Sequence, residues 1–439
     1  MKKNVIWRTI VVFMLASMLV SACAPAATPA PTAEPAKPAE PTKAAEPAAA
    51  EPTKAPEPTK AEAAAPTAAG EFTFGIVMVG PYNDHGWSEA SYLAGQYVEK
   101  MVPGTKMIYI DKVNSADRPG TTGDQLAEEL VSKGAKLIVF NSDDFKDASV
   151  EFKKNNPTIP VLHISGDLAW KDGKNYKEME GYSNLMSQME YGEMIGGCAA
   201  ALTTQTGKIG YVGPLINDET RRFANATYLG AKHCWETYAK KDPKDLKMKV
   251  TWIGFWFNIP GVTADPSTVS DDFLNSGHDV LISALDTMEA LVQTKKAVDG
   301  GKKAWAVAYD YKDACNEAPD VCLGVRYFNW GPGYVKAVKA VMDGSFKSYW
   351  EWAAPDWKDI NNPDTSAMGF NKGKGLSEEN AKNLDAFIGE LAGGLNLWTG
   401  PIKWQDGTDF LKDGEKATDQ QIWYQPQLLE GIEGLSVAP

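Results

Sequence analysis

From Glu71 to about Met342, short apolar segments that favour β-strands alternate with segments of helical periodicity. Such alternation is typical of βαβ units, in which the strands run parallel and helices cover the sheet. A first series has expected strands at 72–79, 106–110, 137–140 and 160–164, with helices at 87–102, 124–133 and 147–154. A second series has expected strands at 208–212, 249–253, 280–282 and 304–308, with helices at 188–204, 218–240, 268–275 and 288–299. After a further expected strand at 323–327, a helix at 334–342 and the tail are expected to cross back between the lobes. We therefore expect an α/β protein with two doubly wound parallel-sheet lobes joined by a hinge.

The two series also suggest domain boundaries. We expect residues 70–185 to form lobe 1, with a return segment at about 309–345, and residues 186–308 to form lobe 2 together with part of the tail. The remaining segment, 346–439, is rich in Gly and Trp, and we expect it to pack across both lobes.

Residues 1–22 have the composition of an export signal. A basic start precedes an apolar run at 9–20, which is too short for a comfortable membrane span but fits a secretory signal. Small residues stand directly before Cys23, a pattern that resembles a bacterial lipobox. In that interpretation Cys23 is diacylated through its sulfur and becomes the mature N-terminus. The alternative is an ordinary signal peptide with an incidental cysteine.

Residues 24–69 consist almost wholly of Ala, Pro, Glu, Thr and Lys. A segment of this composition buries too little apolar surface to offset its conformational entropy. With Cys23, these residues are therefore expected to form a lipidated, disordered stalk (23–69) that leads from the membrane to the folded lobes.

The charge balance limits the partners. The chain has 57 acidic and 44 basic side chains, a formal net charge of −13, and four His. Nucleic-acid binding needs a basic patch, and none stands out, so we expect no nucleic-acid partner. The few His and the irregular Cys spacing predict no metal site.

Ligands of parallel α/β sheets bind outside the carboxyl ends of the strands. Polar and aromatic residues follow most of the expected strands in this chain. The candidates include Asp84 and Trp87, Asp143, Asp167, Trp256, Asp286, and Asp310. Carboxylates and aromatic rings together are typical of a cleft that binds a small molecule with rings and hydroxyl groups.

Catalytic motifs are not found. The sequence contains no phosphate-binding Gly-rich loop, no zinc-protease motif and no Gly-x-Ser-x-Gly elbow. His85 beside Asp84 is either a general base or, more commonly, a hydrogen-bonded turn residue. Asp143 and Asp144 either hold a cation or cap the helix that follows. We expect no enzyme activity and no cofactor.

Four cysteines remain after Cys23, as suits an oxidising compartment. Cys315 and Cys322 bracket a short loop and would close a small ring. Cys198 and Cys234 lie on successive expected helices and would form a second bridge. Free buried thiols are the alternative for both pairs.

Six motifs follow one another along the chain: VGPYNDHGW at 79–87, TGKIGYV at 206–212, VTWIGFW at 250–256, WGPGY at 330–334, MDGSF at 342–346 and WTGPI at 398–402. In their order and spacing they resemble the basic membrane protein (BMP) family of lipoproteins, which are substrate-binding components of ABC-type importers related to purine nucleoside receptors. The resemblance runs from Phe72 to about Trp404.

This resemblance implies a type I periplasmic-binding-protein fold that clamps a ligand between its lobes. It places Asp84 and Trp87 in the cleft, with Trp87 stacking on a ligand ring, and a second aromatic, Phe255 or Trp256, on the other face. Asp286 and Asp310 match acidic positions that face the cleft, and Trp330 lies in a matching motif. Nucleoside receptors of the family usually carry an acid at the end of the first strand, where this chain has residues 76–79, Ile-Val-Met-Val.

The resemblance predicts a monomeric, lipid-anchored protein outside the cytoplasmic membrane. Its partners would be a small heterocyclic ligand, such as a purine nucleoside or nucleobase-like compound, and an ABC transporter permease. The alternatives are a ligand-binding module for a sensor or for surface adhesion, and a secreted nucleoside-processing enzyme.

Overall fold

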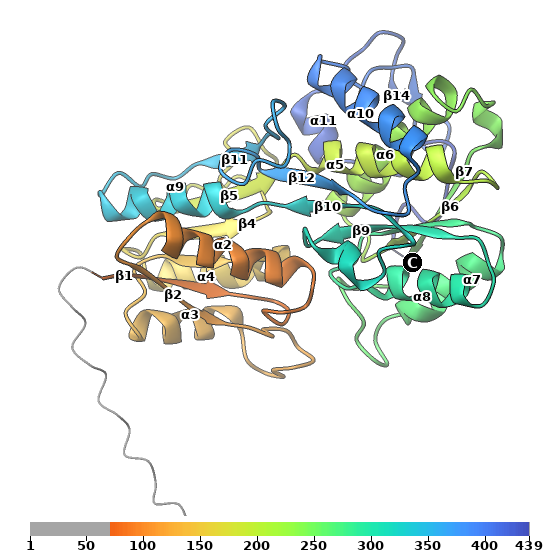
Figure 1. The fold of residues 1–439 in the computed structure, drawn as a ribbon. Coiled ribbons are helices and arrows are strands. Elements are labelled where there is room, and N and C mark those ends of the chain that lie inside the picture. Colours follow the sequence, from red (N-terminus) through yellow and green to blue (C-terminus); the bar gives the residue numbers. More distant parts are fainter. Residues whose placement is uncertain (1–70, 439) are drawn as a thin grey trace, which may run out of the picture. The chain divides into compact units, whose positions relative to one another are not determined.

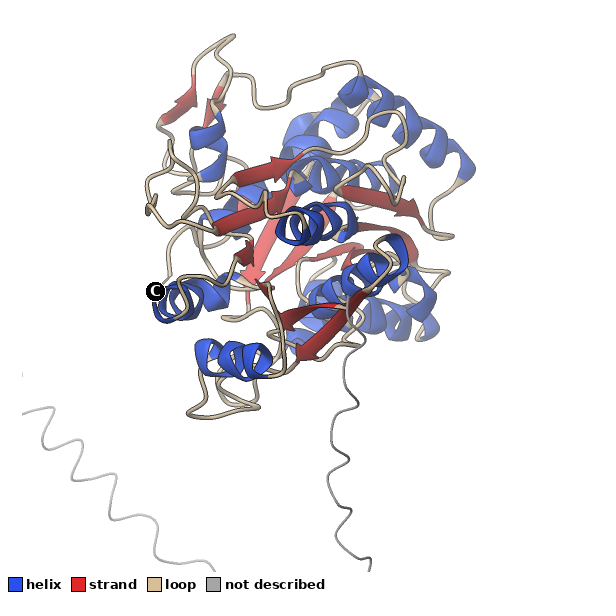
Figure 2. Cartoon of the chain, turned by 90° about the vertical axis from the view of Figure 1, so that its left-hand side faces the viewer, coloured by secondary structure: helices blue, strands red, loops and turns tan. Residues whose placement is uncertain are grey.

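The computed structural model describes residues 71–438. The expected signal segment (1–22), Cys23 and the stalk (23–69) lie outside the described residues. The described part contains two α/β lobes, each built on a parallel sheet (Figure 1). Helices flank the strands in the view of Figure 2, as the alternating sequence pattern predicts.

Lobe 1 has a six-stranded sheet in the order β11-β5-β4-β3-β1-β2. Its strands are β1 (Phe72–Val77), β2 (Thr105–Ile110), β3 (Ile138–Phe140), β4 (Val161–Ile164), β5 (Tyr182–Ser187) and β11 (Trp350–Ala353). Its helices are α2 (Trp87–Met101), α3 (Gly123–Ser132), α4 (Lys146–Asn155) and α9 (Gly331–Met342). All pairs in this sheet are parallel, and every residue of β1, β3, β4 and β5 is buried.

Lobe 2 has a seven-stranded sheet in the order β12-β10-β9-β8-β6-β7-β15, in which only the β10–β12 pair is antiparallel. Its strands are β6 (Lys208–Gly213), β7 (Lys247–Trp252), β8 (Val280–Ser283), β9 (Trp305–Asp310), β10 (Cys322–Phe328), β12 (Met368–Lys372) and β15 (Ile432–Glu433). Its helices are α5 (Met189–Thr203), α6 (Asp218–Thr237), α7 (Pro266–Asn275), α8 (Glu289–Asp299) and α10 (Glu378–Ala392). A small pair, β13 (Ile402–Lys403) with β14 (Asp409–Leu411), and helix α11 (Asp419–Trp423) complete the described chain.

The chain passes between the two sheets three times, after β5, after β10 and after β11. These crossings form the hinge. The return to lobe 1 begins at Gly331, the first residue of α9, and not near residue 309 as expected from the sequence. Strands β9 and β10 stay in lobe 2 because they pair with each other and β9 also pairs with β8.

Helices α5 and α6 pack closely in lobe 2. A Cβ on Gly197 of α5 would lie 2.0 Å from the carbonyl oxygen of Thr227, and one on Gly230 of α6 would lie 2.1 Å from that of Met194. Only glycine permits this backbone approach. The same two helices are joined by the Cys198–Cys234 disulfide, whose Cα atoms are 5.2 Å apart.

The second disulfide joins Cys315 and Cys322, with Cα atoms 5.5 Å apart. It closes the loop between β9 and β10. Both pairings are those considered from the sequence.

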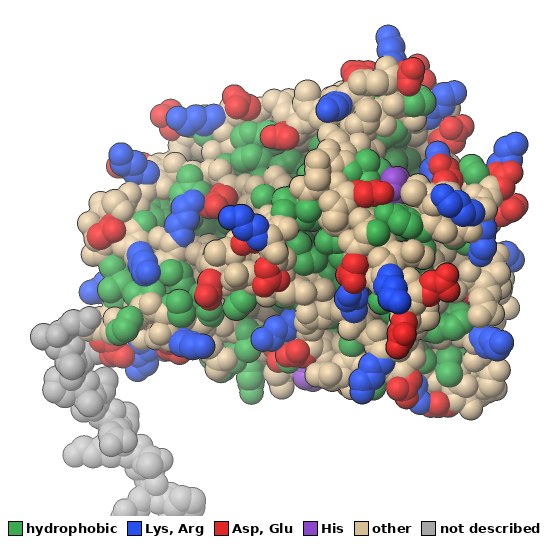
Figure 3. Space-filling model, turned by 45° about the horizontal axis from the view of Figure 1, so that its top comes forward, with side chains coloured by type: hydrophobic (Ala, Val, Ile, Leu, Met, Phe, Trp, Pro, Cys, Tyr) green, Lys and Arg blue, Asp and Glu red, His purple; other side chains and the backbone are tan. Residues whose placement is uncertain are grey.

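Acidic and basic side chains are interspersed over the face drawn in Figure 3, and neither sign gathers into a large patch there. Within residues 71–438, no helix is both long enough and apolar enough to span a membrane. In the same residues, no group of three or more His, Cys, Asp or Glu side chains is arranged to hold a metal ion.

Candidate ligand-binding site

A cavity with an empty volume of about 410 Å³ lies where the carboxyl ends of the strands of both lobes meet. Lobe 1 contributes Trp87, Ser142, Asp143 and Ser165, and lobe 2 contributes Tyr211, Pro214, Glu219, Thr220, Phe223, Trp256, Ala284, Asp286 and Tyr309. The position at the strand ends is where the topology predicts a ligand.

Trp87 is held firmly on the lobe 1 side of the cavity. It begins α2, and its indole Nε1 donates a hydrogen bond to the carbonyl oxygen of Asn141. Its ring makes edge contacts with Phe328 and Trp330, at centroid distances of 5.0 and 5.4 Å. Because the polar edge of the indole is already bonded, the part of Trp87 that remains for a ligand is its apolar ring surface.

Asp84 caps helix α2 beside the cavity. Its carboxylate accepts backbone hydrogen bonds from Gly86, Ser88 and Glu89, at 2.9, 3.0 and 2.9 Å. These bonds favour the ionised form, but burial outweighs them and raises the pKa of Asp84 to about 6. Asp84 is thus adjacent to the cavity, and its main contacts are with its own helix.

Asp286 approaches from lobe 2, and here the lobes touch. A Cβ on Gly86 would lie 1.8 Å from the carbonyl oxygen of Asp286, so the two backbones are in direct contact. The backbone N–H of Asp286 donates to the carbonyl oxygen of Trp256 at 3.1 Å. This hydrogen bond holds the two cavity-lining residues in position relative to each other. Burial, followed by the nearby charges of Asp84 and Glu219, raises the pKa of Asp286 well above its usual range.

Asp310 lies behind the cavity wall. Its neighbour Tyr309 lines the cavity, whereas Asp310 is fully buried and adopts a left-handed backbone conformation (φ 64°). Neither of its carboxylate oxygens has a hydrogen-bond partner among the described residues. Burial and the charges of Asp286 and Asp84 raise the pKa of Asp310 well above its usual range.

Of the other three sequence candidates, one lines the cavity and two do not. Asp143 lines the cavity, at the start of a 3₁₀ turn after β3. Asp167 lines an adjacent hollow, where its carboxylate accepts from Asn175 Nδ2 at 3.0 and 3.2 Å. Trp330 packs behind Trp87, stacked on Phe328 at 4.6 Å, and does not line the cavity.

Two residues with alternative interpretations have local partners. His85 is exposed, and its Nδ1 lies 3.1 Å from Glu89 Oε2, four residues further along the chain. The backbone N–H of Asp144 donates to Ser142 Oγ at 3.2 Å. The contacts of His85 match the turn interpretation. The capping interpretation of Asp143 and Asp144 is wrong, because Ser142 caps the 3₁₀ turn and α4 has no side-chain cap.

Sequence reasoning missed Glu219 and Tyr211. Glu219 stands in the first turn of α6, where an acidic residue normally serves only to complement the helix dipole. It nevertheless lines the cavity, and burial raises its pKa to about 7. Tyr211 lies in the middle of β6, away from the strand end, so no sequence signal marks it. Tyr211 and Ser165 line the cavity, and their buried hydroxyl groups have no hydrogen-bond partner among the described residues.

The cavity lining is acidic and aromatic. Three carboxylates, from Asp143, Glu219 and Asp286, face it, and no Lys, Arg or His lines it. Buried carboxylates without cations are stabilised by ligand N–H and O–H donors. The site is therefore suited to a ring compound that is rich in donors and is neutral or positively charged.

The raised pKa values predict a pH dependence. A folded-state pKa above the unfolded value means that the folded protein holds extra protons, so these groups lower the stability of the unliganded protein as the pH rises through about 6 to 7. Ligand donors favour the ionised carboxylates, so ligand-induced stabilisation should increase over the same range. We expect a larger rise in melting temperature with ligand at pH 8 than at pH 5.5, measured by thermal unfolding. Glu219→Gln should reduce this difference, and a rise that does not depend on pH would contradict the assignment.

Two α/β lobes, three hinge crossings and a cavity at the facing strand ends define the type I periplasmic-binding-protein fold. The fold is similar to that of an ABC transporter solute-binding protein from Aeropyrum pernix K1, with a TM-score of 0.57 and 13% sequence identity over 76% of this chain and 93% of the other.

Residues 72–353 match the model of the Bmp family, described as ABC transporter substrate-binding protein PnrA-like. The chain belongs to this family and is a substrate-binding protein of an ABC transporter. It is 29% identical to the "Purine-binding protein BAB2_0673" of Brucella abortus (strain 2308), over 79% of this chain and 89% of that protein. It is 26% identical to the "ABC transporter nucleoside-binding protein BmpA" of Lactococcus lactis subsp. cremoris (strain MG1363), over 47% of this chain and 53% of that protein.

Proposed function

We propose that the protein binds a purine nucleoside or a nucleobase-like compound between its lobes and delivers it to the permease of an ABC importer. The observation that carries this proposal is the cavity lining, which combines aromatic rings from both lobes with three carboxylates and no basic side chain. The names of the Brucella and Lactococcus relatives support the same ligand class.

The rings supply the first part of the recognition. Trp87 comes from lobe 1, and Trp256 and Phe223 come from lobe 2. A flat heterocycle that contacts rings on both lobes stabilises the arrangement in which the lobes touch, and stacking of a base on an aromatic ring contributes about 1–3 kcal/mol. This links ligand binding to lobe closure.

The carboxylates supply the second part. Asp286 and Glu219 accept hydrogen bonds from ring N–H, amino or hydroxyl groups. The unpartnered hydroxyls of Ser165 and Tyr211 are available as further partners. The absence of an acid at the end of β1 is offset by these lobe 2 carboxylates, and a phosphorylated ligand would be repelled by them.

The site also supports binding without turnover. No nucleophile that is hydrogen-bonded to a base lines the cavity. The carboxylates of the cavity lie beside aromatic side chains, an arrangement suited to binding a ring compound. We infer that the protein is not an enzyme, that it acts as a monomer without nucleic acid, and that lipid on Cys23 anchors it outside the cytoplasmic membrane. The lipobox-like sequence before Cys23 supports the anchor.

The test is a thermal-unfolding screen of the purified protein against purine bases, purine nucleosides, pyrimidine nucleosides and sugars. A ligand at about 100 times its Kd stabilises the folded state by about 2.7 kcal/mol, which is a readily measured shift. We expect purine bases or nucleosides to give the largest shifts. No shift with any purine compound would contradict the ligand class, and release of free base from a nucleoside would contradict binding without turnover.

A further inference from the structure

The last part of the chain connects the lobes a further time. The family match ends at residue 353, and the described chain continues to residue 438. Within this extension, residues 418–436, here called the C-terminal strap, contact α6 of lobe 2 and the aromatic core of lobe 1. No hinge crossing of the two sheets involves these residues.

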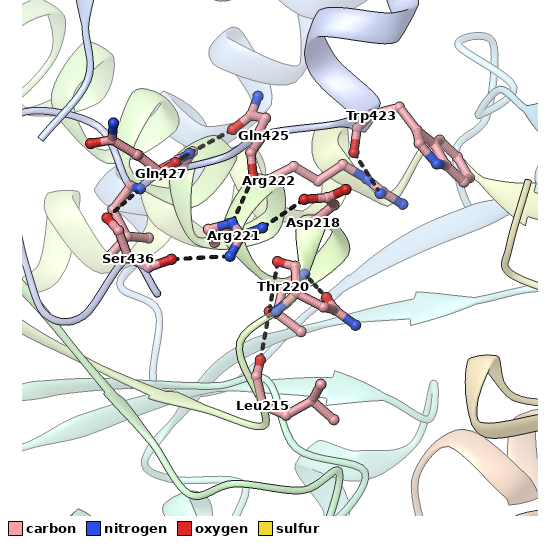
Figure 4. A network of polar contacts seen from close by, with 12 residues as sticks. Leu215, Asp218, Thr220, Arg221, Arg222, Trp423, Gln425, Gln427 and Ser436 are labelled. Carbon is pink, nitrogen blue, oxygen red and sulfur yellow. Dashed lines mark hydrogen bonds and ion pairs between the residues drawn. The ribbon is translucent and has the colours of Figure 1, made fainter. Parts of the chain in front are cut away.

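The strap is fastened to α6 by a network of hydrogen bonds (Figure 4). Arg221 donates through Nε to the carbonyl oxygen of Gln425 at 2.6 Å, and through Nη1 to that of Ser436 at 3.0 Å. Asn225 Nδ2 donates to the carbonyl oxygen of Gln427 at 3.0 Å. Leu428 and Leu429, the next residues, are buried in the lobe 2 core. This end of the strap therefore moves with lobe 2.

Two consecutive aromatic residues fasten the strap to lobe 1. Trp423 makes edge contacts with Trp350 and Trp352 of β11, at centroid distances of 5.2 and 5.3 Å. Tyr424 stacks on Trp170 at 5.7 Å with an interplanar angle of 7°. Both residues belong to the lobe 1 core.

The hydroxyl of Tyr424 makes the polar part of this attachment. It donates to Asp167 Oδ2 and accepts from the backbone N–H of Lys174 at 2.8 Å. Asp167 is buried, so this bond joins a charged group of lobe 1 to the strap away from water.

The strap also touches the helix that lines the cavity. Arg222 Nη1 donates to the carbonyl oxygen of Trp423 at 3.4 Å, and the guanidinium lies 4.1 Å from the centre of the Trp423 ring. Arg222 is next in sequence to the cavity residue Phe223. Asp143 and Glu219 line both the cavity and an adjacent hollow of about 490 Å³. Trp423 and Tyr424 also line this hollow.

We propose that the C-terminal strap is a latch that holds the two lobes together at the cavity, with Tyr424 as its fastening to lobe 1. Periplasmic binding proteins admit their ligands by hinge opening. Because one end of the strap is fixed to α6, separating the lobes pulls Tyr424 away from Asp167. The contact stabilises the closed arrangement selectively, and it slows opening and ligand release. The part concerning release rests on the proposed function, and the part concerning lobe opening does not.

The test removes one hydroxyl group. Tyr424→Phe keeps the stacked ring and removes both polar bonds. Spin labels on Ser132→Cys of α3 and Asp271→Cys of α7, both exposed, report the distance between the lobes, and the four described cysteines are already paired. Tyr349→Phe is the matched control, because its hydroxyl is buried in lobe 1 without a partner among the described residues.

We expect Tyr424→Phe to increase the fraction of open molecules without ligand, and to raise the dissociation rate of adenosine about tenfold, since a hydrogen bond to a charged group corresponds to at least that factor. The control should match the wild type in both measurements. Distance distributions of Tyr424→Phe that coincide with those of the wild type would overturn the latch. If adenosine does not bind the wild type, the proposed ligand fails and the distances alone decide the latch.

Discussion

Replacing Asp286 with asparagine should weaken ligand binding about 10–150-fold, because a hydrogen bond to a charged group contributes about 1.5–3 kcal/mol. The same substitution should stabilise the unliganded protein. Asp286 is buried, and burial followed by the charges of Asp84 and Glu219 raises its pKa. Asp310 is buried beside it, and burial followed by the charges of Asp286 and Asp84 raises the pKa of Asp310. An asparagine side chain does not ionise, so the substitution removes this unfavourable interaction between acids.

Opposite changes in affinity and stability distinguish this role from simple packing. Titration calorimetry gives the affinity, and urea unfolding at pH 7.5 gives the free energy of unfolding. Asp272→Asn is the matched control, since Asp272 is exposed on α7, and it should change neither quantity. An Asp286→Asn variant that binds with the wild-type affinity would remove Asp286 from the site.

Trp87→Ala is expected to lower both stability and affinity. The indole is buried in a cluster with Phe328 and Trp330, and truncating a core Trp to Ala typically costs about 3–5 kcal/mol of stability. Loss of stacking on the ligand should weaken binding by about 1–3 kcal/mol. Trp87→Phe keeps an aromatic face and should recover part of the affinity.

Trp330→Phe separates the two contributions. Trp330 packs in the same cluster but does not line the cavity, so its replacement should lower stability with little change in affinity. If Trp87→Ala loses stability and keeps its affinity, the ring is only part of the core. Unfolding and calorimetric measurements on the three variants decide between these roles.

The alternating pattern predicted both lobes because buried parallel strands and amphipathic helices have distinct sequence periods. Strand β5 was missed because its centre is polar. Ser183 and Asn184 are fully buried there, and Asn184 Oδ1 accepts from the backbone N–H of Ala169 at 2.8 Å. Such polar residues form their hydrogen bonds inside the fold, and the local sequence pattern does not predict that they are buried.

Four of the seven strand-end candidates line the cavity, namely Trp87, Asp143, Trp256 and Asp286. The strand-end rule also named Asp310, which does not line the cavity. Asp310 has a left-handed backbone conformation, and the sequence pattern does not predict this conformation. Glu219 lies in the first turn of α6, where an acidic residue usually complements the helix dipole. Its place in the cavity lining becomes visible only when the two lobes are brought together in the folded structure.

The C-terminal strap shows the main limit of reading the sequence alone. Tyr424 meets Asp167 across 257 positions of the chain. Contacts between segments this far apart depend on the fold of both lobes. The sequence predicted only that residues 346–439 pack across the lobes.

Titration calorimetry with a purine nucleoside and its 5′-monophosphate tests the central claim most directly. The two compounds share the ring and the sugar and differ by a charged phosphate. The acidic, cation-free cavity predicts one nucleoside bound per protein, with the monophosphate bound at least tenfold more weakly. Equal or tighter binding of the monophosphate would contradict this account of the site.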